Sequence, residues 1–214
     1  MIYLFIGVAI LVVGALAMLK FLKNVQPITS SEIADDLDEL KQKIVQYKNG
    51  LENWSEEISS NELDQILDAG QTRTGNGVFL STTGQPIFAY AFRKYIGPAK
   101  NSLMYVLTSA HEYIFRTTTK GTEITVDGQK QGIIRENGTM SDIRNRDIAN
   151  IKRFGATAEN KIFVNGKEVA KIALPDAVAG IKALQIPIEL NAEENQIVQT
   201  FAVYELVANI GDLR

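Results

Sequence analysis

The sequence of 214 residues contains no cysteine and only one histidine, His111. Without cysteine the chain has no disulfide framework, no thiolate-bound zinc and no thiol nucleophile. A metal site would depend on carboxylate oxygens, and the acidic residues show no spacing typical of such a site. We therefore expect no metal and no other cofactor.

An excess of positive charge is also missing. The formal net charge is −3, which gives no electrostatic reason to expect a nucleic-acid partner. Glycine lies near hydroxyl residues at 74–77 and 120–122, but neither stretch has the G-x-x-x-x-G-K-[ST] order of a phosphate-binding loop. These absences argue against nucleic acids and nucleotides as partners.

Charged residues are absent from residues 2–19, and eleven of these eighteen residues are Leu, Ile, Val or Phe. A helix of this length reaches about 27 Å, close to the hydrocarbon thickness of a bilayer. The eleven apolar side chains favour insertion by roughly 3 to 7 kcal/mol in total. The pattern predicts a transmembrane anchor over residues 1–23, with membrane lipid as its partner.

Two properties of this anchor stay open. Cleavage after Ala15-Leu16-Ala17 would make it a signal peptide and release a secreted or periplasmic domain, although no Lys or Arg precedes the apolar run. Lys20 and Lys23 follow the run, so the positive-inside rule places the C-terminal part in the cytoplasm. The alternative is that both lysines only reach to the membrane interface. We expect a single-pass membrane protein with a cytoplasmic domain.

Residues 24–70 have the pattern of an amphipathic helical stalk. Thr29 and Glu32 have the spacing of a capping box, which starts a helix. Apolar residues then recur at steps of four and three, a heptad pattern kept for almost four repeats and interrupted by Gly50. The heptad positions are Ile33, Leu37, Leu40, Ile44, Tyr47, Leu51, Trp54 and Ile58.

The apolar face of the stalk must be buried, and the sequence leaves two ways open. It packs on the chain's own β domain or on a second helix, or it binds a partner helix in a homo-oligomer or a larger membrane complex. The eight heptad residues are therefore candidate partner-binding residues. A second short helix is predicted over residues 61–69, with Gly70 as its stop.

From residue 72 onward the hydrophobic period changes from helical to two. Asp127-Gly128 and Asn165-Gly166 are typical two-residue hairpin turns. The pattern predicts a mainly β domain over residues 71–214, an antiparallel sandwich or barrel. Strands are expected at residues 78–81, 87–96, 103–108, 112–117, 122–126, 132–135, 147–154, 161–164, 167–173, 184–190 and 197–207, with a helical turn at 176–183.

His111 offers the one route to catalysis that the sequence suggests. It lies between Ser109 and Glu112, and a hydrolase site can be drawn from these residue types. Catalytic triads, however, are assembled by folding from separate segments and not from neighbours in sequence. A membrane-tethered hydrolase using His111 is thus the alternative, and we expect a protein that is not an enzyme.

Four basic residues gather in a short stretch after Asp142. They are suited to anionic lipid head groups, at roughly 1 kcal/mol for each charge near the surface. Asp142 and Asp147 are interleaved with them, which favours an ordinary solvated loop instead. The basic residues are Arg144, Arg146, Lys152 and Arg153.

Three stretches resemble a known family. They are GVFLSTTGQPIFAYAFR at 77–93, YIFRTTTKGTEITV at 113–126 and VYEL at 203–206. They are similar to the beside-a-membrane domain of membrane-anchored ubiquitin ligases and their prokaryotic relatives. The chain departs from that family because Thr-Thr-Lys-Gly stands where the family has Asp-Asp-x-Gly, and the second span is missing. Without cysteine there is no ring domain, so the resemblance implies no ligase activity and no catalytic residue.

These observations favour a non-enzymatic role beside a membrane. We expect a single-pass, membrane-anchored binding or scaffold protein, or an accessory subunit of a membrane complex. Its partners would be other subunits or a second copy of the chain, bound through the heptad helix.

Overall fold

Twelve strands form one antiparallel sheet in the described part of the chain. The computed structural model describes residues 28–53, 58–67, 73–81, 84–95, 101–154, 159–173, 184–185, 189–211 and 213. Each strand pairs with the next one in sequence, so the mainly β, antiparallel class is confirmed. The strands are β1 (Ile58–Leu67), β2 (Thr74–Ser81), β3 (Pro86–Lys94), β4 (Ser102–Thr108), β5 (Glu112–Thr118), β6 (Gly121–Val126), β7 (Gln129–Ile134), β8 (Thr139–Asp142), β9 (Asp147–Lys152), β10 (Asn160–Val164), β11 (Lys167–Ile172) and β12 (Leu184–Gln185).

Both predicted hairpin turns are present. Asp127 and Gly128 have φ angles of 50° and 77° and join β6 to β7. Asn165 and Gly166 have φ angles of 50° and 82° and join β10 to β11. Positive φ at both central residues is what a type I′ turn requires, and these residue types tolerate it best.

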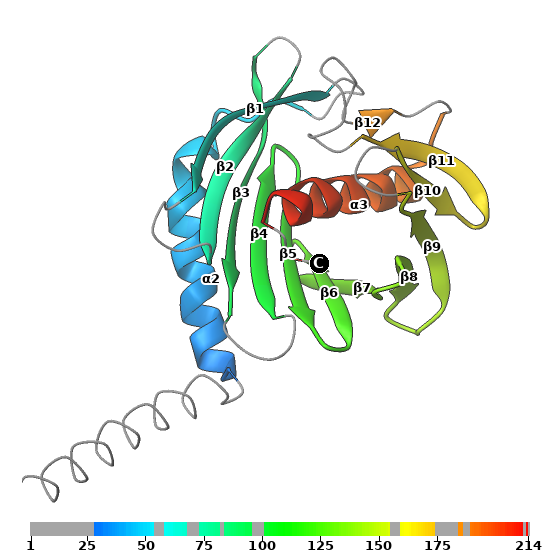
Figure 1. Cartoon of the computed structure of the whole chain (residues 1–214), viewed down its shortest axis with the longest axis horizontal. Coiled ribbons are helices and arrows are strands. Elements are labelled where there is room, and N and C mark those ends of the chain that lie inside the picture. The colour runs from blue at the N-terminus through cyan, green and yellow to red at the C-terminus, as the bar shows by residue number, and fades with distance from the viewer. Residues whose placement is uncertain are drawn as a thin grey trace, which may run out of the picture.

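Helix α2 (Ser30–Ile44) starts at the predicted capping box. The Glu32 amide donates to Thr29 Oγ1 at 3.3 Å, and the Thr29 amide donates to the Glu32 carboxylate at 2.9 Å. A single 3₁₀ turn, η1 (Val45–Tyr47), follows the helix. Helix α2 lies on the outer face of the sheet, along β2, β3 and β4 (Figure 1).

Strand β3 lies between two hydrophobic cores, because its successive side chains point to opposite faces of the sheet. Its aromatic residues Phe88, Tyr90 and Phe92 face the inner core, and the two small residues between them face α2. These small residues are Ala89 and Ala91, and both are fully buried. Because alanine occupies little space, the helix can lie close to the strand.

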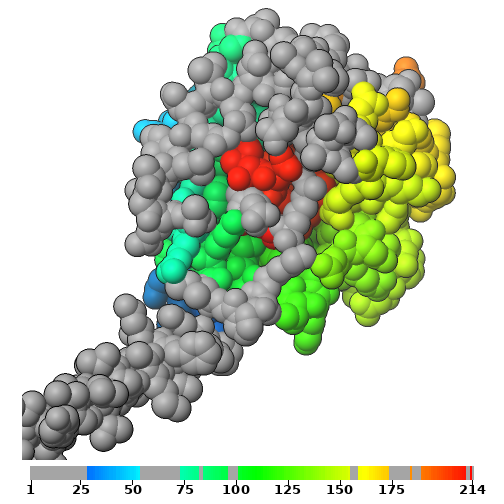
Figure 2. Space-filling view, in the orientation of Figure 1, coloured from blue at the N-terminus to red at the C-terminus, as the bar shows by residue number. Residues whose placement is uncertain are grey.

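Helix α3 (Ala192–Gly211) lies within the curve of the sheet, against the inner core. Figure 2 shows its red atoms between the green strands and the yellow strands. A strand at 197–207 was expected there, and that prediction is wrong. The run is apolar on all sides because sheet residues surround the helix, so it shows no helical stripe. Asn191 caps the start of the helix, because its Oδ1 accepts from the Glu194 amide at 2.9 Å.

The predicted helix at 61–69 is also wrong, because β1 occupies that stretch and pairs with β2. Ile58, assigned to the heptad pattern, is the first residue of β1. The β sheet therefore begins inside the segment assigned to the stalk. Strand β1 pairs with a long neighbour, and this tertiary pairing outweighs the helical spacing of its apolar residues.

Helix α2 and helix α3 are not membrane spans: among the described residues no helix is both long and apolar enough to cross a bilayer. The predicted anchor at 1–23 lies outside the described residues, as do Trp54 and the helical turn expected at 176–183.

Candidate functional site

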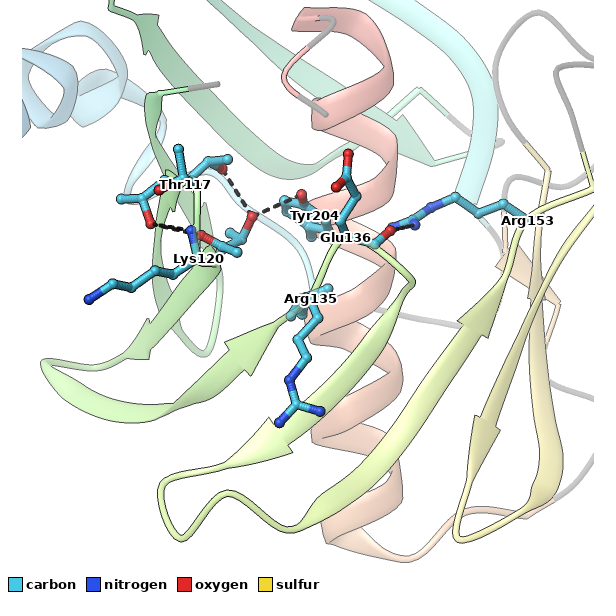
Figure 3. Close-up of a pocket in the computed structure, with 11 residues that line it drawn as sticks. Thr117, Lys120, Arg135, Glu136, Arg153 and Tyr204 are labelled. Carbon is cyan, nitrogen blue, oxygen red and sulfur yellow. Dashed lines mark hydrogen bonds between the residues drawn. The ribbon is translucent and has the colours of Figure 1, made fainter. Parts of the chain in front are cut away.

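A cavity of about 530 Å³ lies where two turns of the sheet approach α3. We call it the threonine pocket. It is lined by residues 117–122 where β5 turns into β6, residues 134–136 at the end of β7, Arg153 after β9 and Tyr204 of α3 (Figure 3). Its size falls within the range of pockets that bind small molecules.

The β5–β6 turn gives the pocket its first wall. The Lys120 amide donates to Thr118 Oγ1 at 3.2 Å, which fixes the turn. Gly121 has a φ of +124°, and a Cβ there would lie 2.6 Å from the carbonyl oxygen of Ile134. Glycine is therefore needed both for the backbone conformation and for the close approach of β7.

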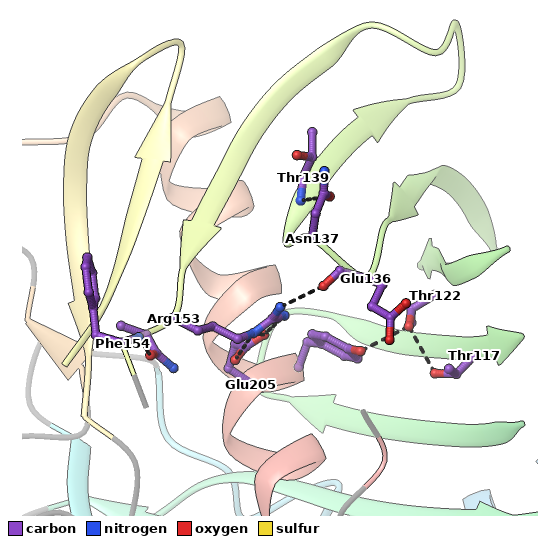
Figure 4. Close-up of polar contacts among 10 residues, drawn as sticks. Thr117, Thr122, Glu136, Asn137, Thr139, Arg153, Phe154 and Glu205 are labelled. Atoms are coloured by element: carbon purple, nitrogen blue, oxygen red, sulfur yellow. Dashed lines mark hydrogen bonds and ion pairs between the residues drawn. The ribbon is translucent and has the colours of Figure 1, made fainter. Parts of the chain in front are cut away.

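A chain of buried hydroxyl groups forms the floor of the threonine pocket. Thr117 and Thr122 face each other across β5 and β6, and their Oγ1 atoms are 3.0 Å apart. Thr122 Oγ1 is also 3.0 Å from the hydroxyl of Tyr204 (Figure 4). The three hydroxyls satisfy one another and connect α3 to the sheet, as buried polar groups must.

An ion pair closes the opposite side of the pocket. Arg153 Nη2 lies 2.6 Å from Glu205 Oε1, and the Glu205 side chain is fully buried (Figure 4). Arg153 Nη1 donates to the carbonyl of Glu136 at 3.3 Å. Burial alone would lower the pKa of Arg153, but hydrogen bonding to Glu205 and its charge outweigh burial and raise that pKa. Arg153 therefore stays charged in the pocket wall.

Two more cations stand at the rim. Lys120 and Arg135 extend away from the centre of the pocket (Figure 3). Arg135 Nη1 lies 3.1 Å from the carboxylate of Asp147, which binds it to β9. The site can thus attract a negatively charged group at its rim and hold apolar atoms against Ile134 and the ring of Tyr204.

The heptad residues are placed on the chain's own sheet as far as the structure describes them. Leu40 and Ile44 are fully buried, and four more pack around the same core with β2, β3 and β4. Those four are Ile33, Leu37, Tyr47 and Leu51. Arg93 of β3 adds ion pairs to Asp36 and Glu39 of α2. This is the first of the two alternatives that the sequence left open.

His111 meets a different partner from those that the sequence offered. Its Nδ1 lies 2.7 Å from the carboxylate of Asp127, whereas Ser109 Oγ donates to Asn53 at 3.1 Å. Partial burial would raise the pKa of Asp127, but hydrogen bonds from the Glu112 amide and from His111 lower it. Ser109 is thus not the hydroxyl that His111 would activate, and His111 does not line the threonine pocket.

The four basic residues after Asp142 do not act as one group. Arg146 is paired with Asp142 at 2.6 Å, and Lys152 lies over the ring of Phe163 at 4.6 Å. Arg153 alone reaches the pocket. Glu205 is a charged residue in the middle of an otherwise apolar run. In the sequence it was the signal that a buried carboxylate has a cationic partner, which is Arg153.

Within the described ranges, no group of three His, Asp or Glu side chains is placed to hold a metal ion. No protein-family model, no curated protein and no solved structure matches this chain. The threonine pocket is therefore judged on its own geometry.

Proposed function

We propose that this chain is a single-pass, membrane-anchored binding protein that serves a membrane complex as a scaffold or accessory subunit. The observation that supports the proposal is the firm attachment of α2 to the sheet through Leu40, Ile44 and the Arg93 ion pairs. Five residues separate Lys23 from Thr29, so the two Cα atoms are at most about 21 Å apart. The β domain is then held beside the bilayer and not on a long flexible tether.

Flotation of vesicles tests the anchor. Replacing Leu11 and Val12 together by Arg adds about 5 to 7 kcal/mol to the cost of insertion, enough to offset the apolar residues. We expect the variant chain to leave the membrane fraction and the wild type to float with it after carbonate washing. The control is Val45→Arg, at a position in η1 that is 52% exposed. Equal flotation of both chains would refute the anchor.

The absence of cysteine gives a direct test of orientation. Val45→Cys introduces one exposed thiol into the domain. With a cytoplasmic domain, a membrane-impermeant maleimide labels this thiol only after the cells are permeabilised. Labelling of intact cells would place the domain on the other side.

Copurification tests the role in a complex. The full chain is crosslinked in native membranes, extracted in detergent and sized. We expect a particle larger than one chain in its micelle, with the same second component in repeated preparations. A strictly monomeric particle would contradict the scaffold role.

A further inference from the structure

The hydroxyl chain of the threonine pocket has hydrogen-bonding capacity left at one end. Its three hydroxyls, those of Thr117, Thr122 and Tyr204, share two hydrogen bonds of 3.0 Å each. Thr122 takes part in both bonds, whereas Thr117 Oγ1 has only its bond to Thr122 among the described residues. A hydroxyl can donate one hydrogen bond and accept two. Thr117 can therefore still bond to a hydroxyl of a bound molecule, as donor or as acceptor.

The charges around the cavity are balanced without a ligand. Both arginines of the lining are held by carboxylates, in the pairs Arg135–Asp147 and Arg153–Glu205. Lys120 and Glu136 contribute one more charge of each sign, and both are exposed to solvent. Lys120 extends away from the centre of the pocket, so an anion attracted to the rim is not held inside (Figure 3).

This balance favours a ligand without charge. An ion that enters the cavity loses its hydration, and the described residues offer it no unpaired opposite charge at the centre. A neutral hydroxyl loses much less on leaving water, and one hydrogen bond to Thr117 offsets that loss.

The rest of the pocket is suited to an apolar body. Ile134 and Tyr204 are almost fully buried, at 2% and 4% exposure, and both contribute to the lining. Each threonine of the lining carries a methyl group beside its hydroxyl. A volume of about 530 Å³ is enough for a small organic molecule.

We infer that the threonine pocket binds an uncharged amphiphile whose polar end is a hydroxyl group. The ligand hydroxyl bonds to Thr117 and extends the hydroxyl chain by one member. The apolar body of the ligand lies against Ile134 and the ring of Tyr204. This binding depends on the pocket alone and not on the proposed membrane anchor.

Equilibrium dialysis tests the inference with three eight-carbon probes: 1-octanol, octanoate and octylammonium. The full chain is placed in phosphatidylcholine nanodiscs, and binding to empty nanodiscs is subtracted. We expect one octanol per chain. Both ions should bind at least about tenfold more weakly, because the cavity does not replace their hydration.

Variants of Thr117 test the role of its hydroxyl. Thr117→Val keeps the branched shape and should weaken octanol binding about fivefold, because one hydrogen bond between neutral groups is lost. Thr117→Ser keeps the hydroxyl and should bind octanol as the wild type does. Thr125→Val is the matched control, because Thr125 is half-buried on the face of β6 opposite to Thr122. Urea unfolding of each variant shows whether it is folded.

Equal or tighter binding of octanoate or octylammonium would overturn the inference. Octanol binding that is unchanged by Thr117→Val, or weakened equally by Thr117→Ser or Thr125→Val, would overturn it as well. If the chain does not remain with the nanodisc, the membrane anchor fails instead. The same dialysis on the chain free in solution then still tests the pocket.

Discussion

Arg153 holds the buried carboxylate of Glu205 with two nitrogen atoms, Nε at 3.2 Å from both oxygens and Nη2 at 2.6 Å from one of them. This contact joins α3 to the segment that follows β9. A fully buried carboxylate depends on its partner, because water cannot solvate it when the partner is lost. Removing one partner therefore costs more free energy of unfolding than the intact ion pair contributes to stability.

Replacing Arg153 by Met should destabilise the chain by about 3 to 5 kcal/mol, because it leaves the Glu205 charge buried without a partner. The measurement is urea unfolding of the full chain in detergent. Arg153→Met combined with Glu205→Met removes both charges and should recover most of the loss. If the double variant is no more stable than Arg153→Met alone, the pair is not what holds α3.

Gly77 lies opposite Tyr90 in the β2–β3 ladder, and the tyrosine ring covers it. A Cβ at Gly77 would approach the Tyr90 hydroxyl to 2.6 Å and Cζ to 2.8 Å. Because Tyr90 is itself buried among aromatic rings, Gly77→Ala should cost about 1 to 3 kcal/mol in the free energy of unfolding.

Gly50→Ala is the control for this substitution. Its Cβ would have 3.9 Å to the nearest atom, the Tyr47 carbonyl oxygen. We expect no loss of stability there in the same urea titration. Equal effects of the two substitutions would show that the Tyr90 contact does not limit the space at Gly77.

Neighbouring residues at the end of α2 test which surface buries the helix. Ile44 is fully buried against the sheet, and Val45 is 52% exposed. Ile44→Ala should cost about 2 to 4 kcal/mol of stability, because it opens a cavity under the helix, and Val45→Ala less than about 0.5 kcal/mol. Unfolding and sedimentation of both variants are compared. Loss of self-association without loss of stability in Ile44→Ala would instead favour a partner helix.

The sequence predicted most strands of the sheet because their side chains alternate between two environments. Strand β5 is typical: Tyr113 and Phe115 are buried, whereas Ile114 and Arg116, which alternate with them, are half-buried. The hairpin turns were predictable for a local reason, since Asn-Gly and Asp-Gly tolerate positive φ. Strand β8, with four residues, is too short to show alternation.

Helix α3 was missed because hydrophobic periodicity detects a helix by the contrast between its apolar face and its polar face. This helix has no such contrast. Leu206 and Val207 are as buried as Phe201 and Ala202. The one local signal was the Asn191–Glu194 capping box, in which the Asn191 amide donates to the Glu194 carboxylate at 3.1 Å.

The threonine pocket could not be predicted, because its walls come from segments that only the tertiary fold brings together. Thr122 and Tyr204 are 82 positions apart, and Arg153 and Glu205 are 52 apart. In the sequence, Arg153 was one member of a basic stretch, and no local feature distinguished its role from that of Arg146. Glu205 alone, as an acid within an apolar run, indicated a buried partner.

The Asp127 carboxylate, which His111 and the Glu112 amide both contact, makes stability depend on pH. Its pKa is lowered in the folded chain, so the stabilisation is complete above the unfolded value of about 3.9 and is lost as the pH falls through the folded value. Asp127→Asn should therefore cost less than about 1 kcal/mol at pH 7, since the side chain is half exposed, and the cost should shrink as the pH falls through the lowered pKa of the folded chain. Urea unfolding of both chains at pH 7, 5, 4 and 3 measures the difference. If the difference in unfolding free energy between the two chains stays constant over this pH range, the carboxylate charge plays no part in holding the β4–β5 turn against β6.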